Sequence, residues 1–318
     1  MVMCTTDSIR GLSAVKSLTQ PRIAGTVLDK SPDFHRMLLV KPGSKVTLAR
    51  IDPGIPSTYR SCESFVPSFH SYVEKLDRLQ YVLHAEEKHS LLIVLQGLDA
   101  GGKDGVVRHI LTSMSPTGCH VAQFKQPTKT ERAHDFLWRV HPHVPAKGQV
   151  SIFNRSHYED VLVARVHRLI PRDVYSKRFG LINDFERLLS VANDTAIVKF
   201  FLHISKEEQL ARFKRRLDDP FRRWKISDAD YEEREHWDEY VTAFEEMLER
   251  TSTWHAPWFV IPANDKEFRD TAISHIVIRT LEELNMSLPQ PVVDLERIHR
   301  RYHAAEAEAN SRASARLV

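Results

Sequence analysis

A glycine-rich loop at residues 97–105 constrains the fold of this chain more than any other feature of its sequence. Residues 91–105 read LLIVLQGLDAGGKDG, an apolar run that leads into Gly97-x-x-x-x-Gly102-Lys103. This spacing is the P-loop (Walker A) pattern, in which backbone N–H groups surround a phosphate chain and the lysine reaches its outer oxygens. Gly97, Gly101, Gly102 and Gly105 would let the backbone curve around the anion. The pattern therefore predicts a strand–loop–helix unit with a phosphate at the helix N-terminus.

Two carboxylates flank this loop. Asp104 stands where a P-loop NTPase has Ser or Thr on Mg²⁺, and Asp99 lies within the loop itself. Carboxylate oxygens are ligands that Mg²⁺ accepts, so we expect a carboxylate-held Mg²⁺ and a phosphate donor unlike an ordinary nucleoside triphosphate. The alternative is a chance match in a surface loop. The position of the loop between a β-type run and a helical segment favours the functional interpretation.

Composition narrows the class of protein. The net charge is +3, which is too small to indicate nucleic acid binding. Three cysteines lie far apart at positions 4, 62 and 119, which favours neither zinc nor disulfides and fits a reducing cytoplasm. No run of about 18 apolar residues indicates a membrane span. We therefore expect a cytoplasmic protein with no membrane or nucleic acid partner.

Strand and helix patterns alternate after residue 88. Five β-type runs occupy residues 91–96, 120–125, 149–154, 196–204 and 258–263. Helical patterns separate them, and two of these open on capping boxes, Thr128-x-x-Glu131 and Ser205-x-x-Glu208. This alternation predicts a three-layer α/β fold with a five-stranded, mainly parallel sheet flanked by helices.

Two further helices show one apolar face each. Ahead of the P-loop, apolar residues recur at helical spacing at 65, 69, 72, 76, 79 and 83. This stripe either covers the sheet or forms a subunit interface. A second stripe runs along residues 237–248, through Trp237, Tyr240, Val241, Phe244 and Leu248.

The third β-type run ends in a polar cluster, Asn154-Arg155-Ser156-His157-Tyr158-Glu159-Asp160. The carboxyl ends of parallel strands face the ligand crevice, so we expect this cluster to meet the P-loop. Arg155 offers a planar fork suited to phosphate oxygens, and Glu159 and Asp160 could bind Mg²⁺ or orient an attacking phosphate. The alternative is that Arg155 and Glu159 are only a helix-surface pair.

A dense basic run follows the fourth β-type run. Residues 212–225 hold seven basic side chains in fourteen, with Arg212 and Arg216 four residues apart on one helical face. Like charges at this spacing repel unless a polyanion lies between them. Pro220 breaks the helix, so the run reads as a helical lid with a hinge that closes over phosphate. The alternative is a solvated helix face. His157 and His203 are expected to be structural histidines or phosphate neighbours.

Several blocks of the sequence closely resemble the family-2 polyphosphate kinases. They are GLDAGGKDG (97–105), FKQP (124–127), HDFLWR (134–139), FNRSHYEDVL (153–162) and DDPxxxWK (218–225). The resemblance covers residues 38–290. Asn154 followed by the Glu159-Asp160 pair resembles the class III branch. Gly97 and Gly101 stand where the family commonly has alanine.

The resemblance implies a P-loop kinase-like fold and a role for each matching residue. Lys103 and the loop amides hold the terminal phosphates, and Asp99, Lys103, Arg155 and Glu159 act at the transferring phosphate. Mg²⁺, with Mn²⁺ as a substitute, is held by Asp99, Asp104 and Glu159. The remaining residues of the phosphate and nucleotide site are Lys125, Asn154 and Asp160, and the polyphosphate clamp of the lid is Arg212, Arg216 and Lys225.

These expectations define a function and its rivals. The resemblance implies reversible, Mg²⁺-dependent transfer of phosphate from inorganic polyphosphate to adenine nucleotides, AMP to ADP and ADP to ATP, by a dimer or tetramer of the chain. Guanine nucleotides are further candidate acceptors. The rivals are an ATP-using nucleoside-monophosphate kinase and a non-catalytic module that binds nucleotides or polyanions. We expect an N-terminal extension at 1–37, a phosphotransferase domain at 38–292 with its lid at about 206–236, and a C-terminal tail at 293–318.

Overall fold

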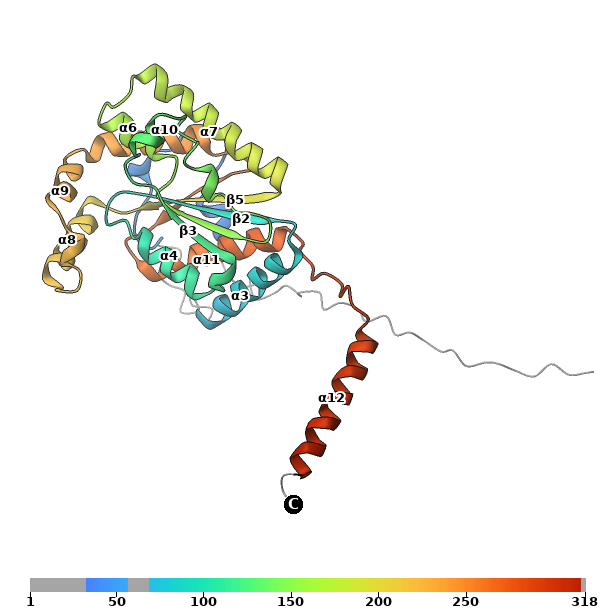
Figure 1. Ribbon diagram of the computed structural model, residues 1–318. Coiled ribbons are helices and arrows are strands. Elements are labelled where there is room, and N and C mark those ends of the chain that lie inside the picture. The colour runs from blue at the N-terminus through green and yellow to red at the C-terminus, as the bar shows by residue number, and fades with distance from the viewer. Residues whose placement is uncertain (1–32, 57–68, 316–318) are drawn as a thin grey trace, which may run out of the picture. The chain divides into compact units, whose positions relative to one another are not determined.

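A mixed β-sheet forms the centre of the fold (Figure 1). The computed structural model describes residues 33–56 and 69–315. In these residues the sheet has six strands in the order β1-β6-β5-β2-β4-β3. Only β1 is antiparallel to its neighbour, β6. The strands are β1 (Leu39–Val40), β2 (Ser90–Gln96), β3 (Cys119–Gln123), β4 (Val150–Asn154), β5 (Thr195–His203) and β6 (Trp258–Pro262).

The predicted α/β class and the parallel sheet are confirmed, but the predicted number of strands, five, is one too few. All five predicted runs form β2 to β6, which are parallel to one another. The sixth strand, β1, is only two residues long and pairs Leu39 with Phe259. A two-residue strand shows no alternation that sequence periodicity could detect, because its place depends on a partner more than 200 residues away.

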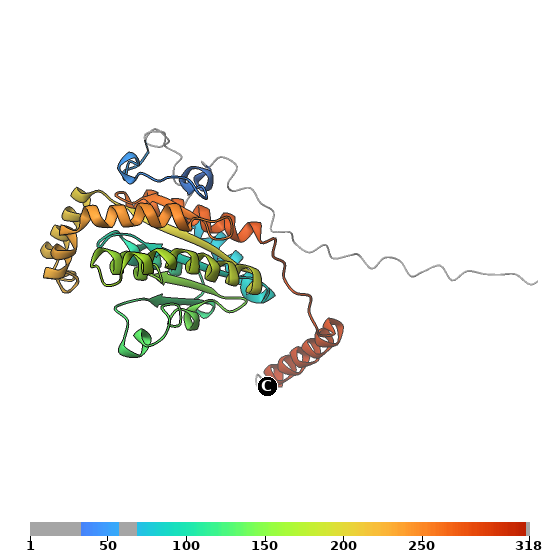
Figure 2. The ribbon, with the colours of Figure 1, turned by 90° about the horizontal axis from the view of Figure 1, so that it is seen from above.

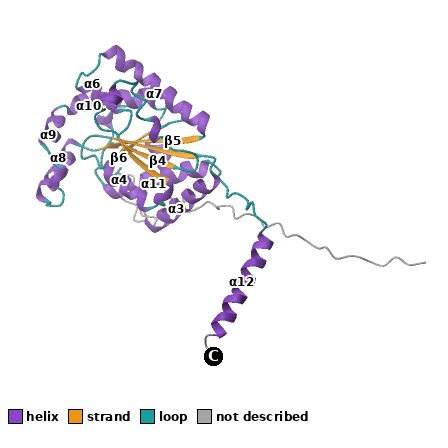
Figure 3. Cartoon of the chain, in the orientation of Figure 1, coloured by secondary structure: helices purple, strands orange, loops and turns teal. Residues whose placement is uncertain are grey.

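Helices cover both faces of the sheet, which gives three layers (Figures 1 and 3). One face carries α3 (Phe69–Glu86), α4 (Lys103–Thr112) and α11 (Lys266–Glu283), with the short α1 (Phe34–Leu38) against α11. The other carries α6 (Glu159–Val166), α7 (Arg172–Asn193) and α10 (Trp237–Thr251). Because both faces are covered, every residue of β2, β4 and β6 is buried, as the continuous apolar runs predict.

The apolar stripe of α3 covers the sheet within the chain itself. Tyr72, Leu76, Leu79 and Leu83 are at most 5% exposed, and α3 packs along α11. The alternative, a subunit interface, therefore does not apply to these four side chains. Position 65 of the stripe lies outside the described residues. The second predicted stripe is also confirmed, since Tyr240, Phe244 and Leu248 of α10 are buried.

The basic run forms a helical segment beyond one end of the sheet. It consists of α8 (Lys206–Asp218), the 3₁₀ turn η4 (Arg223–Lys225) and α9 (Asp228–Glu235), and Figures 1 and 2 both show α8 and α9 together. Ser205 caps α8 by accepting the N–H of Glu208. The predicted reciprocal bond is replaced, because the Ser205 N–H donates to Asn264 Oδ1 at 3.0 Å. The capping box at Thr128 and Glu131 is complete.

The remaining elements are short, apart from the last helix. They are α5 (Lys129–Arg132), η1 (Leu48–Arg50), η2 (Pro116–Gly118) and η3 (His141–His143). The last helix, α12 (Leu295–Ala315), exposes each of its side chains that the structure describes. None of the helices in the described part of the chain has the length and apolar composition that crossing a bilayer requires.

Candidate active site

The P-loop connects β2 to α4 at the carboxyl end of the sheet. Gly97 follows β2 with φ +152°, and a Cβ there would lie 2.9 Å from the Leu202 carbonyl oxygen. Gly102 has φ +104° at the N-cap of α4, and a Cβ there would overlap the guanidinium of Arg269. Both positions therefore require glycine. Because Gly102 has no side chain, α4 begins without a side-chain cap, which leaves its N-terminus available to an anion.

Lys103 lies inside the loop that it follows. Its side chain is 8% exposed, and Nζ donates to the carbonyl oxygens of Gly97 at 2.7 Å and Leu98 at 3.1 Å. Burial, with the positive charge of Arg155 added, lowers the pKa of Lys103 to about 8. A phosphate chain in the loop would supply the negative charge that this ammonium lacks.

Arg155 joins the P-loop to the start of α6. The residue has φ +62°, a left-handed conformation that costs a non-glycine residue about 1–3 kcal/mol. Its N–H donates to Leu95 O, and its guanidinium donates to Asp99 and, at 3.2 Å, to Glu159. Because Arg155 also binds Asp99 of the P-loop, it does not form only a surface pair with Glu159 on the helix. The structure thus gathers the four residues that we predict to act at the transferring phosphate.

Asp104 lies between the P-loop and the segment of α8, η4 and α9, which we predict to be a lid. Its two carboxylate oxygens accept from Asn154 Nδ2 and from Lys225 Nζ, each at 2.9 Å. Partial burial acts to raise the pKa of Asp104, but these two hydrogen bonds and the charge of Lys225 hold the pKa below its usual value. Three residues that are far apart in sequence therefore meet at the first turn of α4.

Asp160 and Lys125, which we predict to belong to the phosphate and nucleotide site, do not contact the P-loop or Arg155. Asp160 accepts from Arg139 Nη2 at 3.0 Å and from Arg178 Nη1 at 3.5 Å, so its carboxylate is engaged away from Arg155. Successive residues of a helix differ by about 100° in direction, which separates Asp160 from Glu159. Lys125 is exposed, and its carbonyl oxygen accepts from Arg139.

The two predicted clamp arginines of α8 differ in their surroundings. Arg212 is 8% exposed, and its guanidinium donates to Glu208, to the Ala100 carbonyl oxygen at 2.8 Å, and to two carbonyl oxygens after β6. Arg216 instead donates to Lys225 O and Asp230 within the lid. The structure therefore does not bring the pair together around an open site, because Arg212 fastens α8 to the P-loop.

Arg269 and Gln209 belong to this site and were missed by sequence reasoning. Arg269, on α11, is 3% exposed, and its guanidinium lies against Gly102 and Gly105. Gln209 donates to the Asp99 carbonyl oxygen at 3.0 Å. Each is a single polar residue in a helical pattern, so only the folded chain shows that both support the loop.

A buried ionic cluster lies beneath Arg155. Glu186 of α7 and Lys199 of β5 are fully buried and 2.6 Å apart. Tyr158 donates to Glu186, and Lys199 also donates to the Thr251 carbonyl oxygen. His157 Nε2 lies 3.3 Å from Glu186, which makes it a structural histidine. We name Glu186, Lys199, Tyr158 and His157 the buried cluster. It anchors the residues that directly follow Arg155.

The carboxylates at 99, 104 and 159 have the oxygen donors that Mg²⁺ prefers. Asp99 and Glu159 share Arg155, while Asp104 is paired with Lys225. Among the residues that the structure describes, no three acidic, histidine or cysteine side chains are grouped closely enough to hold a metal by themselves. The donor set fits a Mg²⁺ ion whose remaining ligands are phosphate oxygens and water, as is usual for this ion.

Comparison of the sequence with known proteins identifies the family to which the chain belongs. The model of the polyphosphate kinase 2 (PPK2) family matches residues 68–289. An AMP/ADP-polyphosphate phosphotransferase of Meiothermus ruber is 47% identical over 260 residues, 81% of this chain and 97% of that protein. An ADP-polyphosphate phosphotransferase of Rhodopseudomonas palustris is 42% identical over 263 residues, 79% of this chain and 91% of that protein.

A solved structure agrees. The crystal structure of polyphosphate kinase 2 from Arthrobacter aurescens TC1 superposes with a TM-score of 0.80 at 38% identity, and the match covers 86% of this chain and 97% of that one. The match to the family model includes the P-loop, the Arg155 segment and the lid. The chain belongs to the polyphosphate kinase 2 family.

Proposed function

We propose that this protein transfers phosphate from inorganic polyphosphate to nucleotides, AMP to ADP and ADP to ATP, in a reversible and Mg²⁺-dependent reaction. The observation that carries the proposal is the position of Arg155, which lies between a P-loop carboxylate and Glu159 beside Lys103. The Meiothermus ruber relative bears the name of this activity toward both AMP and ADP. Because its acceptors are cytoplasmic metabolites, we place the reaction in the cytoplasm.

The chemistry follows from the charges. An oxygen of the nucleotide's terminal phosphate attacks the terminal phosphorus of the polyphosphate. The bond to the bridging oxygen then breaks and leaves a chain that is one phosphate shorter. Lys103 and the N-terminus of α4 hold the donor, while Arg155 exchanges its carboxylate partners for the phosphoryl group in transfer. The acceptor is already ionised at neutral pH, so no general base is needed.

Once Arg155 binds the phosphoryl group, the carboxylates of Asp99 and Glu159 would be available to hold a metal ion. Asp99, Asp104 and Glu159 would hold Mg²⁺, which would supply positive charge to neutralise the phosphate oxygens. Ligands that bind phosphate rather than the base allow acceptors of different length, which fits the use of both AMP and ADP. Lys225 donates to Asp104 in this structure. Asp104 would have to give up this contact to hold the ion, and the Lys225 ammonium could then bind phosphate oxygens.

Product analysis tests the function directly. Purified protein is incubated with Mg²⁺, long-chain polyphosphate and AMP, in the presence of an adenylate kinase inhibitor, and the nucleotides are separated by ion-exchange chromatography. We expect ADP first and ATP later. If ADP is used but AMP is not, the class III assignment fails and the family assignment stands. If neither nucleotide is phosphorylated while ATP phosphorylates AMP, the nucleoside-monophosphate kinase replaces our proposal.

We also propose that two copies of the chain associate through α7. Leu181, Leu188 and Val191 are 52%, 53% and 75% exposed and share one helical face. Asp184 and Arg187 lie on the same stretch as an ion pair. In an antiparallel arrangement centred near residue 186, Leu181 meets Leu188 and Val191 of the second copy. Asp184 of each copy then meets Arg187 of the other, so the face is self-complementary.

A charge placed on this face tests the association. We expect Leu181→Glu to halve the molar mass measured by light scattering during size-exclusion chromatography, with an unchanged melting temperature. Leu210→Glu, which changes an equally exposed leucine on α8, is the matched control and should not alter the mass. A Leu181→Glu protein of wild-type mass would exclude α7 as the interface.

A further inference from the structure

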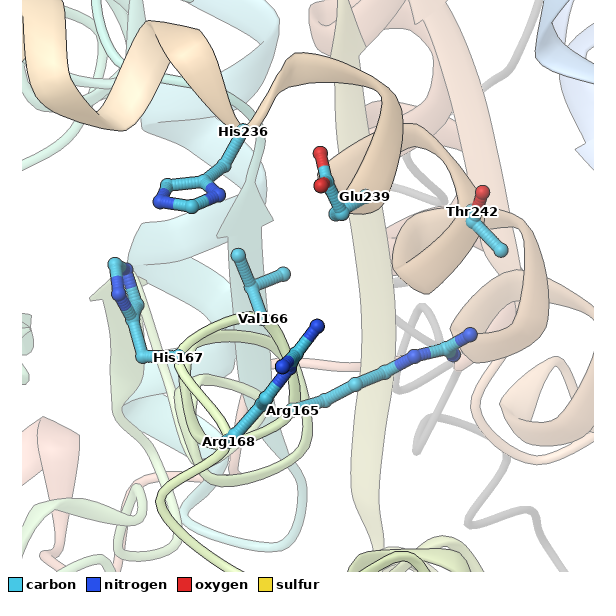
Figure 4. Close-up of a pocket in the computed structure, with 7 residues that line it drawn as sticks. All are labelled: Arg165, Val166, His167, Arg168, His236, Glu239 and Thr242. Atoms are coloured by element: carbon cyan, nitrogen blue, oxygen red, sulfur yellow. The ribbon is translucent and has the colours of Figure 1, made fainter.

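A basic hollow opens at the far end of α6 from the P-loop. It has a volume of about 450 Å³ and is lined by residues 165–168, His236, Glu239 and Thr242 (Figure 4). A second hollow of about 530 Å³ shares Arg165 and Arg168 and continues along residues 169–172 to Tyr175. We name the two together the α6–α7 cavity.

The lining of this cavity is strongly cationic. Arg165, Arg168 and Arg172 recur every three to four residues along it, with the rings of His167 and His236 5.2 Å apart on one wall. Glu239 is the only acid among the residues that line either hollow. Arg165 is partly neutralised by Glu246, and His167 Nε2 lies 2.9 Å from a Glu233 oxygen, whereas Arg168 and Arg172 are exposed.

The backbone holds Arg168 at the junction of the two hollows. Arg168 has φ +53°, and its N–H donates to the Arg165 carbonyl oxygen while that of Leu169 donates to Ala164. This left-handed residue ends α6 and turns the chain toward α7. Arginine is an unfavourable choice for such a position, where glycine or asparagine would fit without strain. Arginine at this position therefore carries a local conformational cost.

Tyr240 lies between the α6–α7 cavity and the transfer site, by which we mean Asp99, Lys103, Arg155 and Glu159. Tyr240 OH lies 3.4 Å from His167 Nε2, which lines the cavity, and donates to Glu233 at 2.7 Å. Burial raises the pKa of Tyr240, and the charges of Glu233, Glu159 and Asp99 raise it further. The negative charges of Asp99 and Glu159 in the transfer site therefore act on the Tyr240 hydroxyl. The eight residues of α6 span about 12 Å from Glu159 to this cavity.

We propose that the α6–α7 cavity binds the distal, non-reacting phosphates of a long polyphosphate chain. The inference rests on the proposed function and adds a binding site to it. Regularly spaced cations suit a linear polyanion with a charge on every unit. A nucleoside would instead need an apolar pocket with a few polar groups placed to hydrogen-bond the base and the sugar. Short donors that end near Lys103 cannot reach across α6, so the cavity discriminates polyphosphates by length.

The test compares donors of two lengths. The variant Arg168→Asn/Arg172→Gln removes two exposed charges, and asparagine tolerates the left-handed backbone at 168. With long-chain polyphosphate we expect KM to rise about ten-fold, because two charge-assisted contacts are lost. With tripolyphosphate we expect kcat and KM to stay within about two-fold of wild type. The KM for the nucleotide should not change.

Arg108→Ala is the matched control, since Arg108 is an exposed arginine on α4, on the opposite face of the sheet. It should leave the KM of both donors unchanged. A rise in the KM of the nucleotide alone would assign the cavity to the acceptor and overturn the proposal. An equal rise for both donors would also overturn it, because the charges would then act on any anion.

Direct binding separates this inference from the proposed function. Titration calorimetry without nucleotide measures the affinity of wild type and the double variant for long-chain polyphosphate. We expect about ten-fold weaker binding by the variant. One outcome is that the wild type transfers no phosphate while the double variant still binds polyphosphate more weakly than the wild type does. In that case the proposed function fails and the binding site stands. Equal affinities would exclude the site whatever the activity.

Discussion

Lys103→Ala should lower kcat with polyphosphate and ADP by about 100-fold or more, because one preorganised charge-assisted contact to the transferring phosphate is worth roughly 3 kcal/mol. The fold should survive, since Nζ donates its hydrogen bonds to the Gly97 and Leu98 carbonyl oxygens of the loop and ties no other element in place among the described residues. The measurement is initial rate at saturating substrates, with the melting temperature as the control for folding. A variant that keeps more than a tenth of the wild-type rate would remove Lys103 from the mechanism.

The pH dependence of the wild type offers an independent check on the same side chain. The ammonium form of Lys103 dominates below its pKa of about 8 and is lost as the pH rises through that value. A neutral amine attracts phosphate less, so kcat/KM for polyphosphate should fall above pH 8. Bound phosphate favours the charged form, so kcat should fall only at higher pH. The Lys103→Ala variant should show no such separation.

Glu186→Ala should reduce the free energy of unfolding by about 3–5 kcal/mol, because it leaves the Lys199 ammonium buried without its counter-ion. Burial already lowers the pKa of Lys199 to about 8 with Glu186 present. Urea unfolding followed by circular dichroism measures the loss. The matched control is Lys147→Ala, which breaks the exposed ion pair with Asp194 just after α7 and should cost less than about 1 kcal/mol.

The double variant Glu186→Leu/Lys199→Met completes this test. Replacing both ions by apolar residues of similar size is often neutral or stabilising, so the double variant should be more stable than Glu186→Ala. If Glu186→Ala loses less than about 1 kcal/mol, water or a neutral Lys199 compensates, and the buried cluster is not what anchors the Arg155 segment.

Sequence patterns predicted the part of the site that depends on local geometry. The P-loop spacing required a strand before Gly97 and a helix after Gly102, and β2 and α4 provide them. The rule that parallel strands end at one edge placed Arg155 near Asp99, which the structure bears out. These predictions succeed because each depends on a few consecutive residues and on one general property of parallel sheets.

Side-chain direction could not be predicted in the same way. The spacing of Arg212 and Arg216 suggested a shared clamp, but Arg212 turns inward to carbonyl oxygens from two other loops. Likewise Glu159 and Asp160 are adjacent in sequence and bind different arginines. Asp160 reaches Arg139, 21 residues away, and Arg212 reaches Ala100, 112 residues away. A single sequence holds no signal for such distant contacts.

The hydrogen bonds of Arg212 limit which part of the predicted lid could move. This side chain joins the middle of α8 to Ala100 of the P-loop and to the chain after β6. These bonds tie the first half of α8 to the loop, and Lys225, after Pro220, contacts the loop through Asp104. If the predicted lid moves during the reaction, we expect the part beyond Arg212 to move and the Lys225–Asp104 bond to break. A polyphosphate that competes for Lys225 would then favour this movement by its own charge.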